Sequence, residues 1–357
     1  MKKKISLLLA AVMAVFAVTA CGSTGQNTSQ TAAQSESVSQ TETESETGAE
    51  TKDYGTPVDV NIMALKGPTA LGMVKMMDDV DNGNLTDENY QFTIAASADE
   101  VTPKLVQGEA DIAAVPANLA SVLYNNTDGG VKVLAINTLG VLYIVENGDT
   151  IHSVEDLKGK TIYASGKGAT PEYALNYILE ANGINPESDV TIEWKSEHSE
   201  CVAAMAADTT AIAMLPQPFV TTAQAKNSDI RVALDLTEEW DKTQEGKANA
   251  SALLTGVVVA RAAFIEEHPE AVDAFLDHYA ESVDYVNENV SDAAGLVGNY
   301  DIVTAQVAEK AIPECNIVYI DGSEMKTQLS GYLNVLYEQN AKAVGGQMPG
   351  DDFYFSR

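Results

Sequence analysis

The stretch Thr161-Ile162-Tyr163-Ala164, followed by Gly166-Lys167-Gly168-Ala169-Thr170-Pro171, shows the unit from which the fold is built. Its first four residues are typical of a strand, and the glycines and proline after them indicate a turn into a helix. The same unit occurs earlier, where a strand predicted at residues 58–64 is followed by Gly67-Pro68-Thr69-Ala70. Strands that alternate with helices over short links predict an α/β fold with largely parallel sheets.

The strand–helix pattern runs through the chain twice, which indicates two lobes. The predicted strands are residues 58–64, 91–95, 111–115 and 132–137 in the first block, and 141–145, 161–164, 190–194 and 211–215 in the second. An apolar strand at residues 252–260 leads out of the second block into a mostly helical end. We expect one lobe from residues 54–141 plus 256–357 and another from 142–255. Two crossing strands, near 139–143 and 254–257, would form a hinge.

The first twenty residues have the composition of an export signal. Three lysines at positions 2–4 precede an apolar run at residues 5–18, which is short for a membrane span. We therefore expect residues 1–20 to be a signal peptide. The run Val18-Thr19-Ala20-Cys21 resembles the lipobox of bacterial lipoproteins. That resemblance implies cleavage before Cys21 and lipid on its thiol, whereas the alternative is an ordinary secretory signal with an incidental cysteine.

The segment after Cys21 has almost no apolar residues. Residues 22–53 are mainly Ser, Thr, Gln, Gly and Glu, and cannot bury enough surface to offset chain entropy. The composition predicts that residues 21–53 are the lipidated cysteine and a disordered tether. A lipid on such a tether would keep the folded body beside a membrane partner.

Charge and metal-ligand composition exclude several classes of partner. The chain has 21 Lys and Arg against 52 Asp and Glu, a net charge of −31; without the three signal lysines it is 18 − 52 = −34. Such a surface repels nucleic-acid phosphates, so we expect no nucleic-acid partner. The four histidines form no metal-binding pair, and Cys201 and Cys315 form no CxxC motif, so we expect free buried thiols, no metal and no cofactor.

Three stretches of the body resemble one family. They are Lys104-Leu105-Val106-Gln107-Gly108-Glu109-Ala110-Asp111-Ile112-Ala113, Ser153-Val154-Glu155-Asp156-Leu157-Lys158-Gly159-Lys160-Thr161-Ile162, and Glu267-His268-Pro269-Glu270-Ala271-Val272-Asp273-Ala274-Phe275-Leu276. In this order they resemble type II periplasmic binding proteins of ABC importers, and within them the NMT1/THI5-like and nitrate- or sulfonate-type receptors. The resemblance implies two α/β lobes that close on a small solute and deliver it to a permease driven by an ATPase. It also implies work outside the cytoplasm, and we expect a monomer.

Candidate ligand residues follow predicted strands, because open α/β sheets bind ligands at the carboxyl ends of their strands. The candidates are Gly67, Pro68, Thr69, Pro116, Ala117, Asn118 and Thr138 in the first lobe, and Gly166, Lys167, Gly168, Ala169, Thr170 and Gln217 in the second. Thr69 and Thr170 are predicted to cap helices, whose N-termini favour an anionic or carbonyl-bearing ligand. The alternative for each loop is an ordinary turn between a strand and a helix. Trp194 either stacks on a ligand ring or packs in the core.

The function predicted from these observations is a lipid-anchored solute receptor of an ABC importer that binds a small anionic or heterocyclic solute. Two enzyme classes on the same fold are alternatives: pyrimidine-precursor synthesis and chorismate-dehydratase-like catalysis. Enzymes of pyrimidine-precursor synthesis are marked by a cysteine-rich segment, which this chain lacks. Chorismate-dehydratase-like enzymes are cytosolic, whereas the export signal predicted here places this protein outside the cytoplasm. A sensory receptor or adhesin without transport is a further alternative. The run His198-Ser199-Glu200-Cys201 contains catalytic residue types, but no third group is predicted to orient the histidine, so we predict no enzyme.

Overall fold

The computed structural model describes residues 52, 54–247 and 250–357. The predicted signal peptide at residues 1–20, the lipidation site Cys21, and residues 21–51 and 53 of the predicted tether lie outside the described residues.

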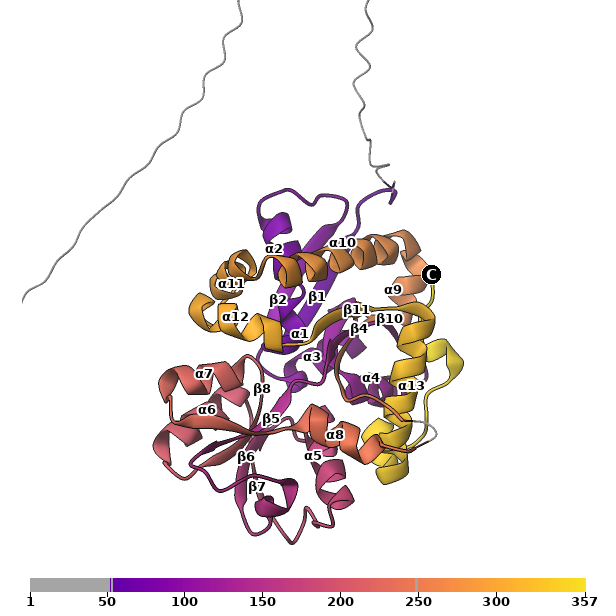
Figure 1. Cartoon of the computed structure of the whole chain (residues 1–357). Coiled ribbons are helices and arrows are strands. Elements are labelled where there is room, and N and C mark those ends of the chain that lie inside the picture. The colour runs from indigo at the N-terminus through magenta and orange to yellow at the C-terminus, as the bar shows by residue number, and fades with distance from the viewer. Residues whose placement is uncertain (1–51, 53, 248–249) are drawn as a thin grey trace, which may run out of the picture. The chain divides into compact units, whose positions relative to one another are not determined.

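The described residues build two mixed sheets flanked by helices (Figure 1). The first sheet has the order β11-β4-β10-β3-β1-β2, from β1 (Asp59–Leu65), β2 (Asn89–Ala95), β3 (Ile112–Pro116), β4 (Val131–Leu139), β10 (Leu254–Arg261) and β11 (Ile317–Ile320). The second has the order β7-β6-β8-β5-β9, from β5 (Leu142–Asn147), β6 (Thr161–Ser165), β7 (Thr191–Lys195), β8 (Ile212–Pro216) and β9 (Ile230–Asp235). We call each sheet with its helices a lobe.

The strands that follow the two crossings explain why the sheets are mixed. β1 pairs in parallel with β2 and β3, and β6 pairs in parallel with β7 and β8. β5 and β10 are the first strands after a crossing, and each runs antiparallel to both of its neighbours. The chain enters each lobe from the edge where the parallel strands end, so its first strand must run away from that edge. The largely parallel sheets predicted above therefore each contain an antiparallel part.

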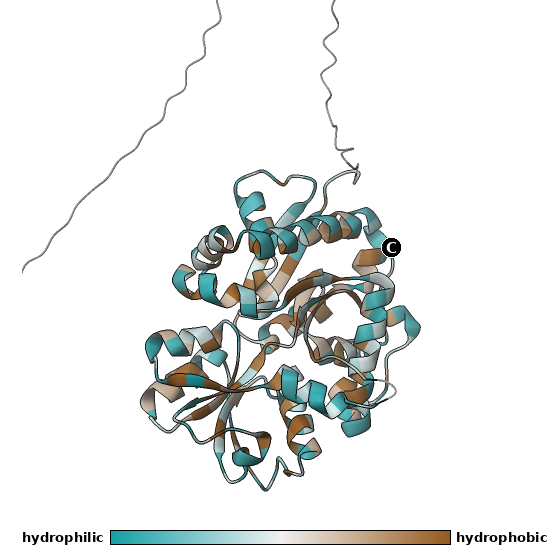
Figure 2. Ribbon diagram, in the orientation of Figure 1, coloured by the Kyte–Doolittle hydropathy of each residue, from teal (hydrophilic) through white to brown (hydrophobic). Residues whose placement is uncertain are grey.

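Helices cover both faces of each sheet. The first lobe has α1 (Pro68–Leu71), α2 (Val74–Asp81), α3 (Ala98–Gln107), α4 (Ala117–Asn126), α9 (Ala262–Glu267), α10 (Pro269–Glu288), α11 (Val290–Asn299), α12 (Ala305–Ala311) and α13 (Gly322–Gln339). The second has α5 (Thr170–Ala181), α6 (His198–Ala207), α7 (Phe219–Lys226) and α8 (Leu236–Gln244). Alternate side chains of a strand point to opposite faces, so Ile62 packs with α2 and α10 and Met63 packs with α3 and α4. Figure 2 shows apolar strands inside and polar helix faces outside.

The predicted elements agree with the structure except in three places. The helix predicted to begin after Gly67 is divided into α1 and α2 at Gly72. Gly72 is packed closely there, since a Cβ at this position would lie 3.0 Å from the Tyr279 hydroxyl. The segment that forms β9 and α8 had no predicted element, and β11 lies in a part predicted as mostly helical. In the described ranges, every helix is too short or too polar to cross a bilayer.

Aromatic side chains join the C-terminal helix to the second lobe. The ring of Tyr332 on α13 lies 5.5 Å from the ring of Trp240 on α8, which lies 4.7 Å from the ring of Tyr177 on α5. Trp240 is fully buried, and its indole N–H donates to the carbonyl of Ser251 at 2.7 Å. Buried aromatic surface contributes strongly to packing, so α13 holds the two lobes together on this side.

Candidate functional site

A cavity of about 290 Å³ lies where strands of both sheets end. Its walls contain the residues that follow β1, β2 and β3 in the first lobe and β6 and β7 in the second. We call this cavity the cleft. The carboxyl edge of an open α/β sheet is the usual place for a ligand, because loops there vary without disturbing the core. Here two such edges face the same space.

Three charged side chains at the cleft have neither an ionic nor a hydrogen-bonding side-chain partner in the described part of the chain. Lys66 follows β1, Asp99 lies in the first turn of α3, and Lys167 lies in the loop after β6. Two further charged residues are paired: Lys195 is 3.2 Å from Glu193, and Glu197 accepts from the Ser199 hydroxyl at 3.0 Å. Together the three lysines and two carboxylates of the wall carry one net positive charge, in a chain whose net charge is −31. The cleft is therefore a local exception to the acidic surface.

Two helices begin at the cleft with N-termini that no side chain caps. The N-cap residues are Ser97 for α3 and Ala169 for α5, and neither makes a side-chain cap hydrogen bond. Helix N-termini leave backbone N–H groups unpaired and carry partial positive charge, which favours an anion. The N-terminus of α6 differs, because Glu197 and Glu200 form a capping box there.

Four predicted ligand residues line the cleft, and Gly168 lies beside them. Pro116, Gly166, Lys167 and Ala169 are in its wall. Gly168 has a φ of 77°, which a residue with a Cβ adopts only under strain, and its N–H donates to the Glu172 carboxylate. The loop after β6 is thus held in shape by the helix that follows it.

Asn118 and Thr170, also predicted ligand residues, meet behind the cleft and join the lobes. The Asn118 amide donates to the carbonyl of Ala343 at 2.9 Å and to that of Gly168 at 3.4 Å. Its oxygen accepts from the Thr170 hydroxyl at 3.4 Å, and Thr170 accepts from the Tyr332 hydroxyl at 3.3 Å. Asn118 and Thr170 are both fully buried. They form an inter-lobe junction rather than part of the cleft wall.

Other predicted ligand residues lie beneath the cleft. Three of them are buried at the starts of α1 and α4: Gly67, Pro68 and Ala117. The other two contact the side chain of Asn137. The backbone carbonyl of Thr69 accepts from the Asn137 amide, and the Thr138 hydroxyl donates to the Asn137 side-chain oxygen. The prediction that Thr69 and Thr170 cap helices is wrong, because the N-cap residues are Gly67 and Ala169. Each threonine lies inside the first turn of its helix, one or two residues too late to cap it.

The side chains of Gln217 and Trp194 make their contacts within the second lobe. The Gln217 side-chain oxygen accepts from the backbone N–H and the hydroxyl of Thr221, at 3.2 and 2.9 Å. Gln217 is only 6% exposed. Trp194 on β7 is partly buried and packs against the apolar core, as one of its two interpretations predicted.

Cleft residues at the ends of β2 and β7 were not among the predicted ligand residues. Ser97 and Asp99 follow β2, Lys195 is the last residue of β7, and His198 lies three positions beyond it. All four lie at carboxyl ends of strands, where ligand residues are expected. His198 is hydrogen-bonded to Ser165, and burial lowers the pKa of its imidazole to about 4. Its imidazole is therefore neutral at pH 7.

The cysteines are free and buried, as predicted for Cys201 and Cys315. Burial raises the pKa of the Cys201 thiol to about 11, which leaves the thiol protonated and unreactive at neutral pH. Among the described residues, no three His, Cys, Asp or Glu side chains gather closely enough to hold a metal ion.

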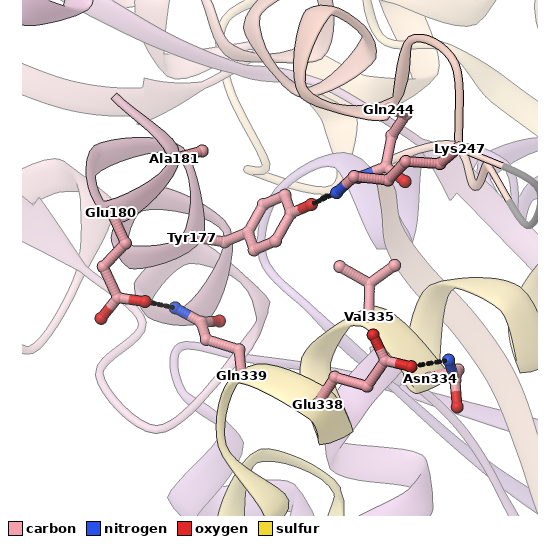
Figure 3. Close-up of a pocket in the computed structure, with 9 residues that line it drawn as sticks. All are labelled: Tyr177, Glu180, Ala181, Gln244, Lys247, Asn334, Val335, Glu338 and Gln339. Carbon is pink, nitrogen blue, oxygen red and sulfur yellow. Dashed lines mark hydrogen bonds between the residues drawn. The ribbon is translucent and has the colours of Figure 1, made fainter. Parts of the chain in front are cut away.

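A larger groove of about 550 Å³ lies between α5, α8 and α13 (Figure 3). Its polar side chains are paired with one another: Glu180 with Gln339, Glu338 with Asn334, and Tyr177 with Lys247 and Gln244. No strand ends at it. Although this groove has the larger volume, we assign the candidate ligand site to the cleft. Of the two hollows, as far as their described lining residues show, the cleft has charged side chains without any side-chain partner and helix N-termini that no side chain caps.

Comparisons with known proteins agree with this geometry. A family model described as ABC transporter, phosphonate, periplasmic substrate-binding protein matches residues 82–302. No curated protein matches the chain. The NMT1/THI5-like subgroup stays a prediction.

Several solved structures share the fold. An ABC transporter protein from Parabacteroides distasonis has 22% identity and a TM-score of 0.67, over 84% of this chain and 99% of that one. The alkanesulfonate-binding protein SsuA from Xanthomonas axonopodis pv. citri has 14% identity and a TM-score of 0.65, over 83% and 96%. The nitrate-binding protein NrtA from Synechocystis PCC 6803 has 13% identity and a TM-score of 0.59, over 80% and 82%. The family match spans more than half of the sequence, and the chain belongs to the phosphonate-type periplasmic substrate-binding proteins of ABC transporters, a class that binds small solutes outside the cytoplasm.

Proposed function

We propose that this protein is the receptor of an ABC importer for a small solute that carries one net negative charge. The observation that carries the proposal is the pair of cleft lysines, Lys66 from the first lobe and Lys167 from the second, which have no ionic partner within residues 52, 54–247 and 250–357. An anion between them would be attracted by both lobes at once. Its binding would therefore stabilise the closed arrangement, which the permease and its ATPase would recognise.

The proposed lobes are residues 54–141 plus 256–357 and residues 142–255, with the hinge at the two crossings. At the first crossing, the Asn316 amide donates to the carbonyl of Gly140 at 2.6 Å, and Leu139 donates to the carbonyl of Asn316 at 3.1 Å. A Cβ at Gly140 would lie 2.2 Å from the Thr237 hydroxyl oxygen. The crossing is thus tightly packed, so lobe motion would be a rotation of rigid bodies about few residues.

The proposal includes a monomer that is exported by the signal at residues 1–20 and held at the membrane by lipid on Cys21. Residues 21–53 would be the tether. A Cys21→Ser protein should leave the membrane fraction while its purified body keeps its affinity for solute. A lower affinity in that variant would mean that the tether takes part in binding.

We propose binding without turnover. Ser165 and His198 are hydrogen-bonded in the cleft wall, but among the described residues no carboxylate orients the imidazole, and its pKa of about 4 makes it a weak base. The Cys201 thiol beside the cleft is protonated. Enzyme function on this fold predicts that a bound solute is converted, so incubation followed by mass spectrometry separates the two functions. Recovery of unchanged solute supports the receptor.

A thermal-shift panel tests the proposed solute class. The panel contains nitrate, methanesulfonate, methylphosphonate, a pyrimidine and matched neutral and cationic solutes, at constant ionic strength. A ligand that binds only the native state increases the free energy of unfolding, by about 2.7 kcal/mol when its concentration is one hundred times its Kd. The melting temperature rises as a result. We expect shifts with monoanions that fit about 290 Å³ and none with cations. Shifts only with cations or neutral solutes would overturn the assignment of charge.

A further inference from the structure

His198 and Ser165 form a hydrogen-bonded pair in the wall of the cleft. Ser165 ends β6, His198 begins α6, and the Ser165 hydroxyl lies 2.5 Å from Nδ1 of the imidazole. The ring of Phe219 lies 5.0 Å from that of His198 and covers one face of it. Nε2 has no hydrogen-bond partner among the described residues. One polar ring atom thus stays available in a wall whose other charged groups are lysines and carboxylates.

The neighbours of Ser165 decide which ring nitrogen carries the proton. The Ser165 side chain is buried, and among the described residues Nδ1 of His198 is its hydrogen-bond partner. A proton on Nδ1 would leave the buried hydroxyl hydrogen with only the nearby Cys201 sulfur, a weak acceptor, whereas an unprotonated Nδ1 accepts it. The proton of the neutral imidazole therefore lies on Nε2. The N-terminus of α6 also disfavours a charged ring, because the helix dipole is positive there.

We propose that His198 is a specificity-determining residue that donates a hydrogen bond from Nε2 to an oxygen of the solute, and that Ser165 is the positioning residue that fixes this tautomer. The inference rests on the proposed function, since it places the solute in the cleft. A neutral donor adds recognition without adding charge. The cleft would therefore hold an oxyanion through two lysines and one uncharged N–H, and would disfavour a cation at that wall.

Nitrogen NMR of the 15N-labelled protein tests the tautomer without any ligand. At pH 7 we expect the His198 Nδ1 to resonate as an unprotonated nitrogen and Nε2 as a protonated one. His152 is the matched control, because its side chain is 63% exposed in the same lobe and should exchange between tautomers. In Ser165→Ala, His198 should lose its single tautomer. A charged ring, or a proton on Nδ1 in the unaltered protein, would overturn the inference.

Binding of methanesulfonate and methylphosphonate tests the contact with solute. We expect the better of these probes to shift the Nε2 resonance of His198 and not that of His152. His198→Leu should weaken binding roughly 10- to 100-fold, the range for loss of one hydrogen bond to a charged acceptor, and His198→Gln should restore part of it. His152→Leu should bind as the unaltered protein does. If His198→Leu fails to fold, the resonance shift in the unaltered protein still decides the contact.

The outcomes separate this inference from the proposed function. A probe that binds while the Nε2 resonance stays unchanged, or that binds His198→Leu normally, would overturn the role of His198 and leave the anion receptor intact. If neither probe nor any anion of the panel binds, the anionic solute itself is overturned, and with it the donor role of His198.

Discussion

The cleft and the groove are both hollows between the lobes, yet they differ in what their polar groups do. The groove has about 550 Å³ and the cleft about 290 Å³. In the groove, Glu180 binds Gln339 and Lys247 binds Tyr177, so a ligand would have to displace existing partners. In the cleft, the side chains of Lys66 and Lys167 have neither an ionic nor a hydrogen-bonding partner among the described residues. Free charge at strand ends therefore favours the cleft as the candidate site, although the groove has the larger volume.

The largest expected effect comes from the cleft lysines. Replacing both Lys66 and Lys167 with Met should weaken binding of the preferred anion by roughly 100-fold, since each charged hydrogen bond contributes about 1.5–3 kcal/mol and the sites are solvent-exposed. Isothermal titration calorimetry measures the loss. Lys247→Met in the groove is the control and should keep the affinity. If Lys247→Met weakens binding and the double variant does not, the ligand occupies the groove.

The pH dependence of the free energy of unfolding should show the lowered pKa of His198. Its pKa is about 4 when folded and about 6.5 in the unfolded chain, so between these values only the unfolded state binds the proton. Its contribution to stability is fully present above about pH 6.5 and is lost as pH falls towards 4, by up to about 3 kcal/mol. Urea unfolding measures this loss, and His198→Gln should remove it.

His152→Gln is the control variant, because the side chain of His152 is 63% exposed and lies in the same lobe. The charged side chains beside His198 in the cleft wall are those of Asp99, Glu197, Lys66, Lys167 and Lys195, and both variants keep them. An unchanged slope in His198→Gln would contradict the buried, neutral ring.

Changes in the inter-lobe junction of Asn118 and Thr170 should lower the stability of the protein. Asn118→Ala leaves the Ala343 carbonyl and the Thr170 hydroxyl without their partner, which should lower the free energy of unfolding by about 1–3 kcal/mol. Tyr332→Phe removes one weaker bond at 3.3 Å and should lower it by about 1 kcal/mol or less. Chemical denaturation measures both. Equal or reversed effects would mean that Asn118 is not the centre of the junction.

The smallest effect should come from the rim of the groove. Gln339→Ala removes an exposed hydrogen bond to Glu180 and should change stability by no more than about 0.5 kcal/mol, with unchanged solute affinity. Any change in affinity that exceeds the error of the calorimetry would mean that a substitution in the groove alters solute binding in the cleft.

The sequence predicted most strands because the apolar runs are short, and several of them end close to a glycine or proline, as before Gly166 and at Pro116. It missed β9 and α8, which lie in a stretch with weaker apolar pattern, and β11, which has only four residues. It predicted Lys167 as a ligand residue, and Lys167 lies in the wall of the candidate cleft. This was possible because a charged residue in a loop after a strand can be recognised from the sequence alone. It did not separate Pro116, in the cleft wall, from Asn118, two residues away in the junction.

By itself, the sequence determined the two α/β blocks, the strand-end loops and the resemblance to binding proteins, because these depend on local periodicity and short motifs. Only the tertiary structure decided which loops face one another. Lys66 and Lys167 are 101 positions apart, and His198 meets Ser165 across 33 positions. Such pairings depend on strand order and on packing between lobes, which no local pattern contains. The same packing buries Asn118 and Thr170 and leaves the two lysines without ionic partners among the described residues.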